Sequence, residues 1–325
     1  MTAWMKAGVA TPDGLKIADV ARPVPSEEQV LVHVLAAGMN RADLAAAKGI
    51  GVASADSFGK PIGMEWAGEI VEIGSAVRHC HIGDRVACSG TGGYAEYAVA
   101  DQYRVFALDA GQDFASAAIL PLALMTAHDA LRVAGFRAGE TLLVQGASSA
   151  VGLMALQIGR ILDAALVVGG ARSERKRAQL PTFGANQTVD TSAPHWAKAI
   201  LALTDGAGAN VAIDMVSGNP FNELMKAVAV TGRVINVGRL GGTIAEFDFN
   251  LHALRRLTFH GTTFRTRTLD QVREIAAGVL KTLWPHVLSG KLALPIDRRF
   301  ALTDAEAAHA YMAANEHFGK ILLTC

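Results

Sequence analysis

The chain has 325 residues, of which 51% are hydrophobic, and its formal net charge at pH 7 is zero. This length is enough for two domains with separate hydrophobic cores. A neutral chain argues against nucleic acid or an anionic membrane as a partner. We expect no apolar run as long as a membrane span, and the first residues lack the apolar core of a signal peptide.

The cysteines indicate the redox compartment. There are only three, Cys80, Cys88 and Cys325. Their odd number and wide spacing argue against a disulfide framework and are typical of a reducing environment. We therefore expect a soluble cytoplasmic enzyme.

Short strands dominate the first part of the chain, through about residue 122. The clearest are predicted at 30–36, 69–73 and 85–88, and sustained helical periodicity is scarce there. Between residues 123 and 263, strands alternate with helices. The strands predicted in this part lie at 142–144, 166–168, 187–189, 211–215, 234–237 and 257–261. This order of elements is typical of a doubly wound parallel sheet.

In the last part of the chain, after residue 263, the regular alternation of strands and helices ends. A helix is expected from Thr268 through about Leu288, followed by a strand at 293–300. Thr303 and Glu306 fit a capping box for a helix through about residue 315, and a strand at 320–323 closes the chain. We therefore expect the doubly wound domain, residues 123–263, to be inserted in a discontinuous domain made of residues 1–122 and 264–325.

The segment 141–171 contains a strand, a turn of small residues that opens a helix, and a second strand. At Gly146, Ser148, Ser149 and Gly152 the small side chains let the backbone approach a pyrophosphate, which then lies against free N–H groups at the helix start. The spacing departs from G-x-G-x-x-G, so an ordinary strand-to-helix turn is the alternative. The periodic strands and helices around the turn favour a dinucleotide-binding Rossmann domain.

The end of the second strand bears on the choice of nucleotide. Enzymes that use NAD usually carry Asp or Glu there, about 20 residues after the glycines. Here Gly-Gly-Ala at 169–171 is followed by Arg172, Ser173, Arg175 and Lys176. Cationic donors suit a phosphate on the ribose. The alternative, a solvated basic helix start, is electrostatically unfavourable, so we expect NADPH in preference to NAD.

Five blocks carry a resemblance to a known family. They are AAGMNRADLAAAKG at 36–49, PIGMEWAGEIVEIGSAVRHCHIGDRVAC at 61–88, GGYAEYAVAD at 92–101, LPLALMTAHDAL at 120–131 and LLVQGASSAVG at 142–152. In this order they resemble the zinc-free quinone oxidoreductases, the zeta-crystallin branch of the medium-chain dehydrogenase/reductase superfamily. The resemblance implies an α/β fold, a Rossmann sheet inserted in a GroES-like, mainly β catalytic domain. It also implies a homodimer joined at the sheet edge, residues 257–263.

The resemblance bears on metal as well. Zinc enzymes of the superfamily carry a catalytic Cys, a Gly-His-Glu block and often a site of four cysteines. This chain has GMNRAD, at 38–43, where the ligand cysteine would be and Gly63, Met64 and Glu65 where the histidine block would be. Three cysteines cannot form a four-thiolate site. His79, Cys80 and His81 are consecutive, and consecutive residues seldom converge on one ion. We expect no metal.

The resemblance assigns a cofactor site residue by residue. Asn40 lies near the nicotinamide ribose and the substrate, and Thr126 lies beside the nicotinamide. The pyrophosphate loop is Ser148, Ser149, Ala150 and Val151, and the ribose phosphate contacts are Arg172, Ser173 and Lys176 after Gly170. Val237, Gly238 and Arg239 line the nicotinamide, and the backbone of Phe264 and Arg265 holds the carboxamide. The substrate borders on Asn40, Phe58, Met64 and Arg239.

Structural roles stay open for some of these residues. Asn40 either positions the substrate or stabilises the turn into the helix at 41–47, and Thr126 either contacts the nicotinamide or bonds the backbone of its own helix. For Glu65 we favour pairing with a nearby cation over a role as general acid. Pro181 is expected to shorten the preceding helix. Ala45 stands where relatives often carry a tyrosine, so no proton donor is assigned.

The expected chemistry follows from the missing metal. Without zinc to polarise a carbonyl, hydride transfer to an acceptor that is already electron-poor remains open. We predict an NADPH-dependent oxidoreductase that reduces a quinone or another electron-poor conjugated carbonyl. One alternative is reduction of the C=C bond of an enal, enone or enoyl thioester. A non-catalytic NADPH-binding sensor or structural protein is the other.

Overall fold

The structure is a computed structural model that describes residues 3–49 and 58–325. The chain divides into two compact units. The first unit contains the chain through Ala123 together with Arg267–Cys325, and the second unit is Leu124–Thr266. Separate sheets form the centres of the two units, so each is described by itself.

The second unit is built on a six-stranded sheet with the order β10-β9-β8-β11-β12-β13. Its strands are β8 (Thr141–Gln145), β9 (Leu166–Ala171), β10 (Gln187–Asp190), β11 (Ala209–Asp214), β12 (Val228–Asn236) and β13 (Thr258–Gly261). Every neighbouring pair is parallel, which confirms the doubly wound Rossmann sheet. The order reverses between β8 and β11, and in such folds ligands bind outside the carboxyl ends of the strands at this switch point.

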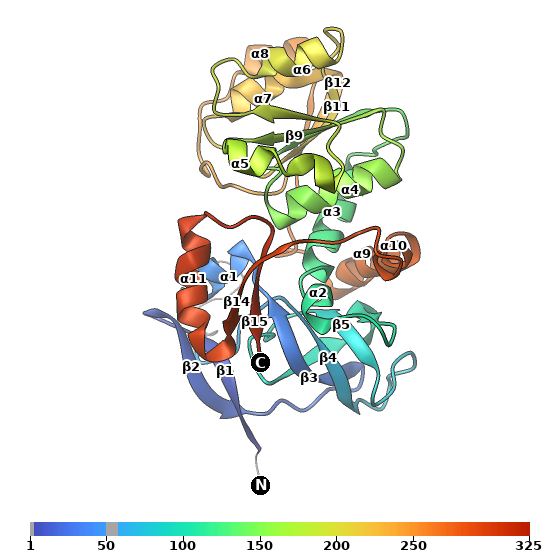
Figure 1. Ribbon diagram of the computed structural model, residues 1–325, viewed down its shortest axis with the longest axis vertical. Helices are drawn as coiled ribbons and strands as arrows, with labels where there is room; N and C mark the ends of the chain where they lie inside the picture. The colour runs from blue at the N-terminus through green and yellow to red at the C-terminus, as the bar shows by residue number, and fades with distance from the viewer. Residues whose placement is uncertain (1–2, 50–57) are drawn as a thin grey trace. The chain divides into compact units, whose positions relative to one another are not determined.

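Helices cover both faces of this sheet (Figure 1). They are α3 (Pro121–Val133), α4 (Ala150–Ile161), α5 (Glu174–Arg177), α6 (Ala197–Leu203), α7 (Phe221–Ala227) and α8 (Phe249–Arg255). Helix α4 buries Leu153 and Leu156 against β8 and β9. Helix α5 is short, as predicted, because Pro181 opens a separate 3-10 turn, Leu180–Phe183.

The first unit contains a two-stranded and a seven-stranded sheet. The strands are β1 (Trp4–Thr11), β2 (Gly14–Ala21), β3 (Gln29–Gly38), β4 (Glu65–Ile73), β5 (Arg85–Ser89), β6 (Tyr97–Asp101), β7 (Val105–Ala107), β14 (Ile296–Ala301) and β15 (Lys320–Thr324). The larger sheet has the order β14-β15-β3-β4-β5-β7, with β6 also paired to β3. Because β15 pairs with β3, the end of the chain completes a sheet that starts near its beginning.

Two helix predictions for the last part of the chain need correction. The region expected as one helix through Leu288 contains α9 (Leu269–Thr282) and α10 (Trp284–Leu288), and Pro285 lies in the first turn of α10. The capping box at Thr303 and Glu306 is wrong. Helix α11 (Ala305–Ala314) follows a 3-10 turn, Leu302–Asp304, so Thr303 is inside a helical turn and not in the extended conformation of an N-cap.

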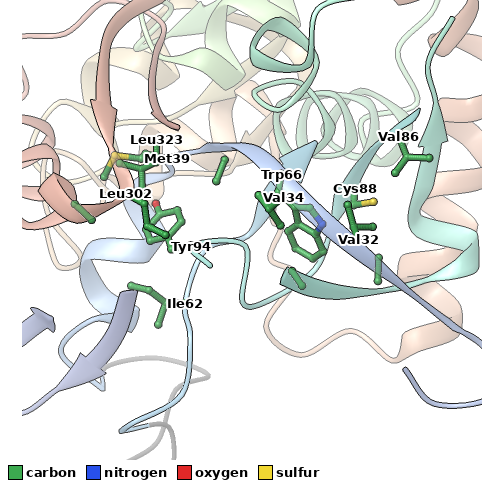
Figure 2. Packing of buried hydrophobic residues seen from close by; sticks show 14 of the residues in the cluster. Val32, Val34, Met39, Ile62, Trp66, Val86, Cys88, Tyr94, Leu302 and Leu323 are labelled. Atoms are coloured by element: carbon green, nitrogen blue, oxygen red, sulfur yellow. The ribbon is translucent and has the colours of Figure 1, made fainter. Parts of the chain in front are cut away.

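The core of the first unit lies between β3, β4 and β5. Trp66 of β4 is fully buried and lies beside Val34 and Cys88 (Figure 2). Tyr94, also fully buried, is nearer to Ile62 and Met39 in the same view. Leu44 and Ala46 of α1 (Arg41–Ala46), the helix that follows β3, pack against this core.

One apolar segment is longer than the sequence led us to expect. Phe114–Val133, which contains α2 (Phe114–Ala117) and α3, is long and apolar enough to cross a membrane by length and composition. The expectation that no such run exists is therefore wrong. Since 72% of the segment's most apolar window is buried inside the fold, it has the properties of a core helix.

Candidate active site

The turn between β8 and α4 is shaped for close approach of a ligand. Gly146 adopts a positive φ of 77°, and a Cβ there would lie 2.9 Å from Cβ of Met215, so glycine is required. Ser149 is the N-cap of α4: its Oγ accepts from Gly152 N at 3.1 Å and donates to Gly146 O at 2.9 Å. Ser148 makes no hydrogen bond within the described chain through its hydroxyl, so of the two serines it is the one with a donor to offer a phosphate.

The same turn is anchored to the end of β9. Gly146 N and Ala147 N both donate to the carbonyl of Gly170, at 3.0 and 2.9 Å. A Cβ on Gly170 would lie 2.8 Å from Cγ2 of Thr191. Gly170 therefore joins the turn to β9, and Ala150 and Val151 begin the helix whose free N–H groups face the turn.

The basic residues after β9 have different roles in the structure. Ser173 is the N-cap of α5, and its Oγ accepts from Lys176 N at 3.4 Å. Arg177 is held by an ion pair with Asp190 at 3.1 Å and donates to the carbonyl of Arg172 at 2.7 Å. The Arg172 side chain is exposed, and nothing in the described chain pairs with it. Prediction from the sequence gave no role to Arg177, because its partner lies on another strand.

The residues expected near the nicotinamide follow β12 and β13. Val237 N and Gly238 N donate to the carbonyl of Asp214 at 2.8 and 3.1 Å. Arg239 is exposed, whereas Phe264 is half-buried. The exposed Arg265 donates its backbone N–H to Thr263 Oγ1 at 3.2 Å. Sequence-based prediction missed Asp214, which ends β11 beside this strand end.

In the first unit, Asn40 forms hydrogen bonds with both partners of a buried ion pair. Lys320 and Glu65, which are 2% and 0% exposed, form an ion pair. The Lys320 ammonium also donates to Asn40 Oδ1 at 2.6 Å and to the carbonyl of Met39 at 3.2 Å. The Asn40 amide donates to Glu65 Oε1 at 3.0 Å, and Leu122 N donates to Glu65 Oε2 at 2.8 Å. The predicted pairing of Glu65 with a cation is confirmed.

A second buried acid stabilises the start of α1. Asp43 is fully buried, and its Oδ2 accepts from Tyr94 OH at 2.6 Å and from Asn40 N at 2.8 Å. Burial raises the pKa of Asp43 to about 7, against the opposite effect of the Tyr94 hydrogen bond. Asn40 is the N-cap residue of α1, and its side chain contributes to the ion-pair network.

Comparisons with known proteins agree along the chain. A family model described as alcohol dehydrogenase GroES-like domain matches residues 26–110, and one described as zinc-binding dehydrogenase matches residues 150–280. Quinone oxidoreductase-like protein 2 of Bos taurus is 30% identical over 99% of this chain and 95% of its own. The chain belongs to the medium-chain dehydrogenase/reductase superfamily, in its quinone oxidoreductase branch. It is therefore an oxidoreductase of a superfamily that binds nicotinamide cofactors.

Other members of the superfamily are similar over their whole length. The quinone oxidoreductase of Pseudomonas aeruginosa is 29% identical over 98% of this chain and 97% of its own. The structure of Escherichia coli quinone oxidoreductase complexed with NADPH has a TM-score of 0.87 at 22% identity, covering 99% of both chains. CurK enoyl reductase has a TM-score of 0.85 at 24% identity, covering 99% and 98%. At these two identities the likeness concerns the fold alone.

The remaining predicted residues of this oxidoreductase lie in both units. Phe58 and Met64 are half-buried in the first unit, where Phe58 packs on the hydrophobic core. Thr126 is half-buried in the middle of α3. Thr126 and the residues after β12 belong to the second unit. Of the residues predicted to border the substrate, Asn40, Phe58 and Met64 belong to the first unit and Arg239 to the second.

The metal-ligating side chains of the chain are either scattered or occupied by other partners. Among residues 3–49 and 58–325, no three His, Cys, Asp or Glu side chains are grouped to hold an ion. Glu65, the acid beside Met64, is neutralised by Lys320. Cys80 and Cys88 are buried, and burial raises the pKa of both thiols, which disfavours the thiolate that a metal needs. The described residues do not fit a zinc site.

Proposed function

We propose that the chain is an NADPH-dependent oxidoreductase that reduces a quinone or another electron-poor conjugated carbonyl without a metal. The observation that carries this proposal is the end of β9. The strand ends at Ala171 without an acid for the ribose hydroxyls, and the exposed Arg172 follows it. An exposed guanidinium with unused donors suits a ribose phosphate.

The residues present fit a dinucleotide. Gly146 leaves room where a side chain would clash, the Ser148 hydroxyl is available, and α4 presents its first N–H groups to the same turn. The solved relative from Escherichia coli is a complex with NADPH, which supports the choice of nucleotide. When bound, the cofactor supplies a hydride. The chain's own residues would hold the pyrophosphate and the ribose phosphate and leave the acceptor to delocalise the charge.

The balance of the reaction needs one proton from outside the cofactor. NADPH, a proton and a quinone give NADP and the hydroquinone. In the first unit, Lys320 uses all three N–H donors on protein oxygens. Asp43 is fully buried. Neither is placed to protonate a substrate, so we propose that solvent supplies the proton.

The test is a screen of NADPH oxidation with quinones, enones and enals as acceptors. We expect turnover with quinones, no stoichiometric zinc in the purified protein, and activity that a chelator leaves intact. Tight NADPH binding without turnover on any acceptor would contradict an enzymatic role and favour a sensor. Loss of activity on chelation would contradict the metal-free mechanism.

Reduction of a C=C bond is the second candidate. The similarity in fold to CurK enoyl reductase favours it, since the same hydride donor serves both reactions. The same screen separates the two. Saturation of 2-cyclohexenone or of an enoyl thioester, with quinones reacting slowly, would favour this candidate over the first.

We also propose a homodimer joined through β13. This strand lies at the edge of the six-stranded sheet, and all four of its residues are exposed. Phe259 of this strand is 47% exposed, and Phe249 and Ile244, which precede it in the chain, are 76% and 90% exposed. This part of the second unit therefore carries apolar surface that a second copy would cover. Light scattering at micromolar concentration should give twice the monomer mass, and a monomer there would contradict the proposal.

A further inference from the structure

Three polar side chains form one network at the carboxyl ends of β11 and β12. Asp214 ends β11 and is fully buried, and Asn236 ends β12 with 7% of its surface exposed. Ser217 lies between them. The Asn236 amide donates to Ser217 Oγ, and Ser217 Oγ donates to the carbonyl of Gly238 at 2.9 Å. The network therefore connects the loop after β11 with the loop after β12.

Asp214 holds the first of these loops in an unusual conformation. Its Oδ1 accepts from Val216 N at 2.8 Å and from Ser217 N at 3.0 Å. Ser217 has a φ of 54°, a left-handed conformation that is unfavourable for a residue with a side chain. Burial raises the pKa of Asp214, and the hydrogen bonds from Ser217 and Val216 oppose this effect. The strain at Ser217 is thus offset by buried hydrogen bonds to one carboxylate.

The second loop is fixed by contact with the first. Gly241 N donates to the carbonyl of Val216 at 2.7 Å. A Cβ on Gly238 would lie 2.5 Å from the carbonyl oxygen of Met215, and a Cβ on Gly218 would lie 2.3 Å from that of Gly241. The two loops therefore touch without room for side chains, and Ser217 sets the direction of the Gly238 carbonyl.

We propose that Asp214, Ser217 and Asn236 are positioning residues, which fix the segment 237–239 for the nicotinamide half of the cofactor. This inference rests on the proposed function. The inference is based on the position of the network in the sheet. Strand β11 is next to β8 at the switch point, and Met215, which follows β11, packs against the Gly146 turn. The basic residues for the other half of the cofactor follow β9, which is separated from β11 by β8. The network therefore serves one half of the cofactor only.

The decisive variant is Ser217→Gly. Glycine adopts a φ of 54° without strain, so the variant removes the hydroxyl while the backbone conformation stays accessible, and the variant should remain folded. We expect single-turnover hydride transfer from NADPH to slow about tenfold or more, because small misplacements of reacting groups carry large rate penalties. Binding of 2′,5′-ADP, the adenosine half of NADPH, should be unchanged by calorimetry.

A matched control is Ser116→Ala in the first unit. Ser116 Oγ donates to Asp113 Oδ2 at 2.9 Å, and its loss should leave hydride transfer unchanged. Ser217→Ala, which also lacks the hydroxyl, should slow hydride transfer as the glycine variant does. An unchanged hydride-transfer rate in both Ser217 variants would overturn the proposal, as would an equal loss of 2′,5′-ADP binding. A wild-type protein that transfers hydride to no acceptor would reject the proposed function itself, before any variant is compared.

Discussion

Two sets of charged groups, one in each unit, have opposite environments. After β9 in the second unit, Arg172 is exposed and keeps its donors free within the described chain. In the first unit, Lys320 and Glu65 are buried, and every N–H of the ammonium has a protein acceptor. Groups that bind a ligand need unused donors, whereas groups saturated by the protein hold the fold together. This difference separates binding residues from framework residues.

The largest expected effect concerns the framework. Lys320→Met leaves Glu65 buried without its cation, and breaking a buried pair in this way costs about 3 to 5 kcal/mol. We expect a loss of this size in the free energy of unfolding, measured by urea denaturation. The double variant Glu65→Gln with Lys320→Met removes both charges and should recover part of the loss.

The matched control is an exposed ion pair. Lys16 and Glu306 are 2.9 Å apart, with side chains 50% and 52% exposed. Lys16→Met should leave the unfolding midpoint unchanged, since exposed pairs contribute little. If Lys320→Met also left the unfolding midpoint unchanged, the ion pair would not stabilise the fold. The contrast between the saturated Lys320 and the exposed Arg172 would then fail.

The next effect concerns the residues proposed to bind the ribose phosphate. Replacing Arg172 and Lys176 by Ala should weaken NADPH binding tens-fold or more and leave NADH nearly unaffected, because each charge-assisted bond to a phosphate is worth about 1.5 to 3 kcal/mol. Fluorescence titration with both nucleotides measures the ratio of the two dissociation constants. Equal losses for NADPH and NADH would reject the assignment of this cluster.

Arg177→Ala is the control for this cluster. Arg177 belongs to the same basic run, yet it is occupied by Asp190 and by two backbone carbonyls. Its removal should lower stability and leave the ratio of NADPH to NADH affinity unchanged. A changed ratio would mean that Arg177 also contacts the nucleotide.

The difference between exposed and saturated groups also explains which features could be predicted from the sequence. The Rossmann strands and the small-residue turn at Gly146 are local patterns, and periodicity and spacing are enough to find them. The Glu65 and Lys320 positions are 255 residues apart, and no local pattern pairs them. A cation partner for Glu65 was expected, but its identity needed the pairing of β15 with β3, which places Lys320 beside Met39.

Two other residues that the sequence analysis misread or missed also have physical explanations. The Thr303 capping box failed because a 3-10 turn starts one residue earlier. Asp214 was overlooked because a lone acid at a strand end has no distinctive spacing, and its partner Asn236 is on the next strand of the sheet. Contacts between neighbouring strands therefore decide which polar residues at the site are saturated.

The last expected effect concerns Asp43 and appears only in the pH dependence of stability. The pKa of this buried acid is about 7 in the fold and near 4 when unfolded. The folded state binds more protons between these values, so Asp43 lowers stability as pH rises from about 4 to 7, by at most about 1.4 kcal/mol per pH unit. The buried His309, whose pKa is lowered to about 4 by desolvation, acts in the opposite direction.

The difference in stability between Asp43→Asn and wild type isolates the Asp43 contribution, because His309 is common to both. We expect the variant to gain stability relative to wild type from about pH 4 to 7 and the difference to stay constant at higher pH, by urea unfolding at each pH. Asp190→Asn is a control of opposite sign. The Ser192 hydrogen bond lowers the pKa of Asp190, so its stabilising effect is present above the unfolded pKa and is lost as pH falls. A pH-independent difference for Asp43→Asn would mean that Asp43 stays ionised across this range, as a framework charge stabilised by Tyr94 and Asn40.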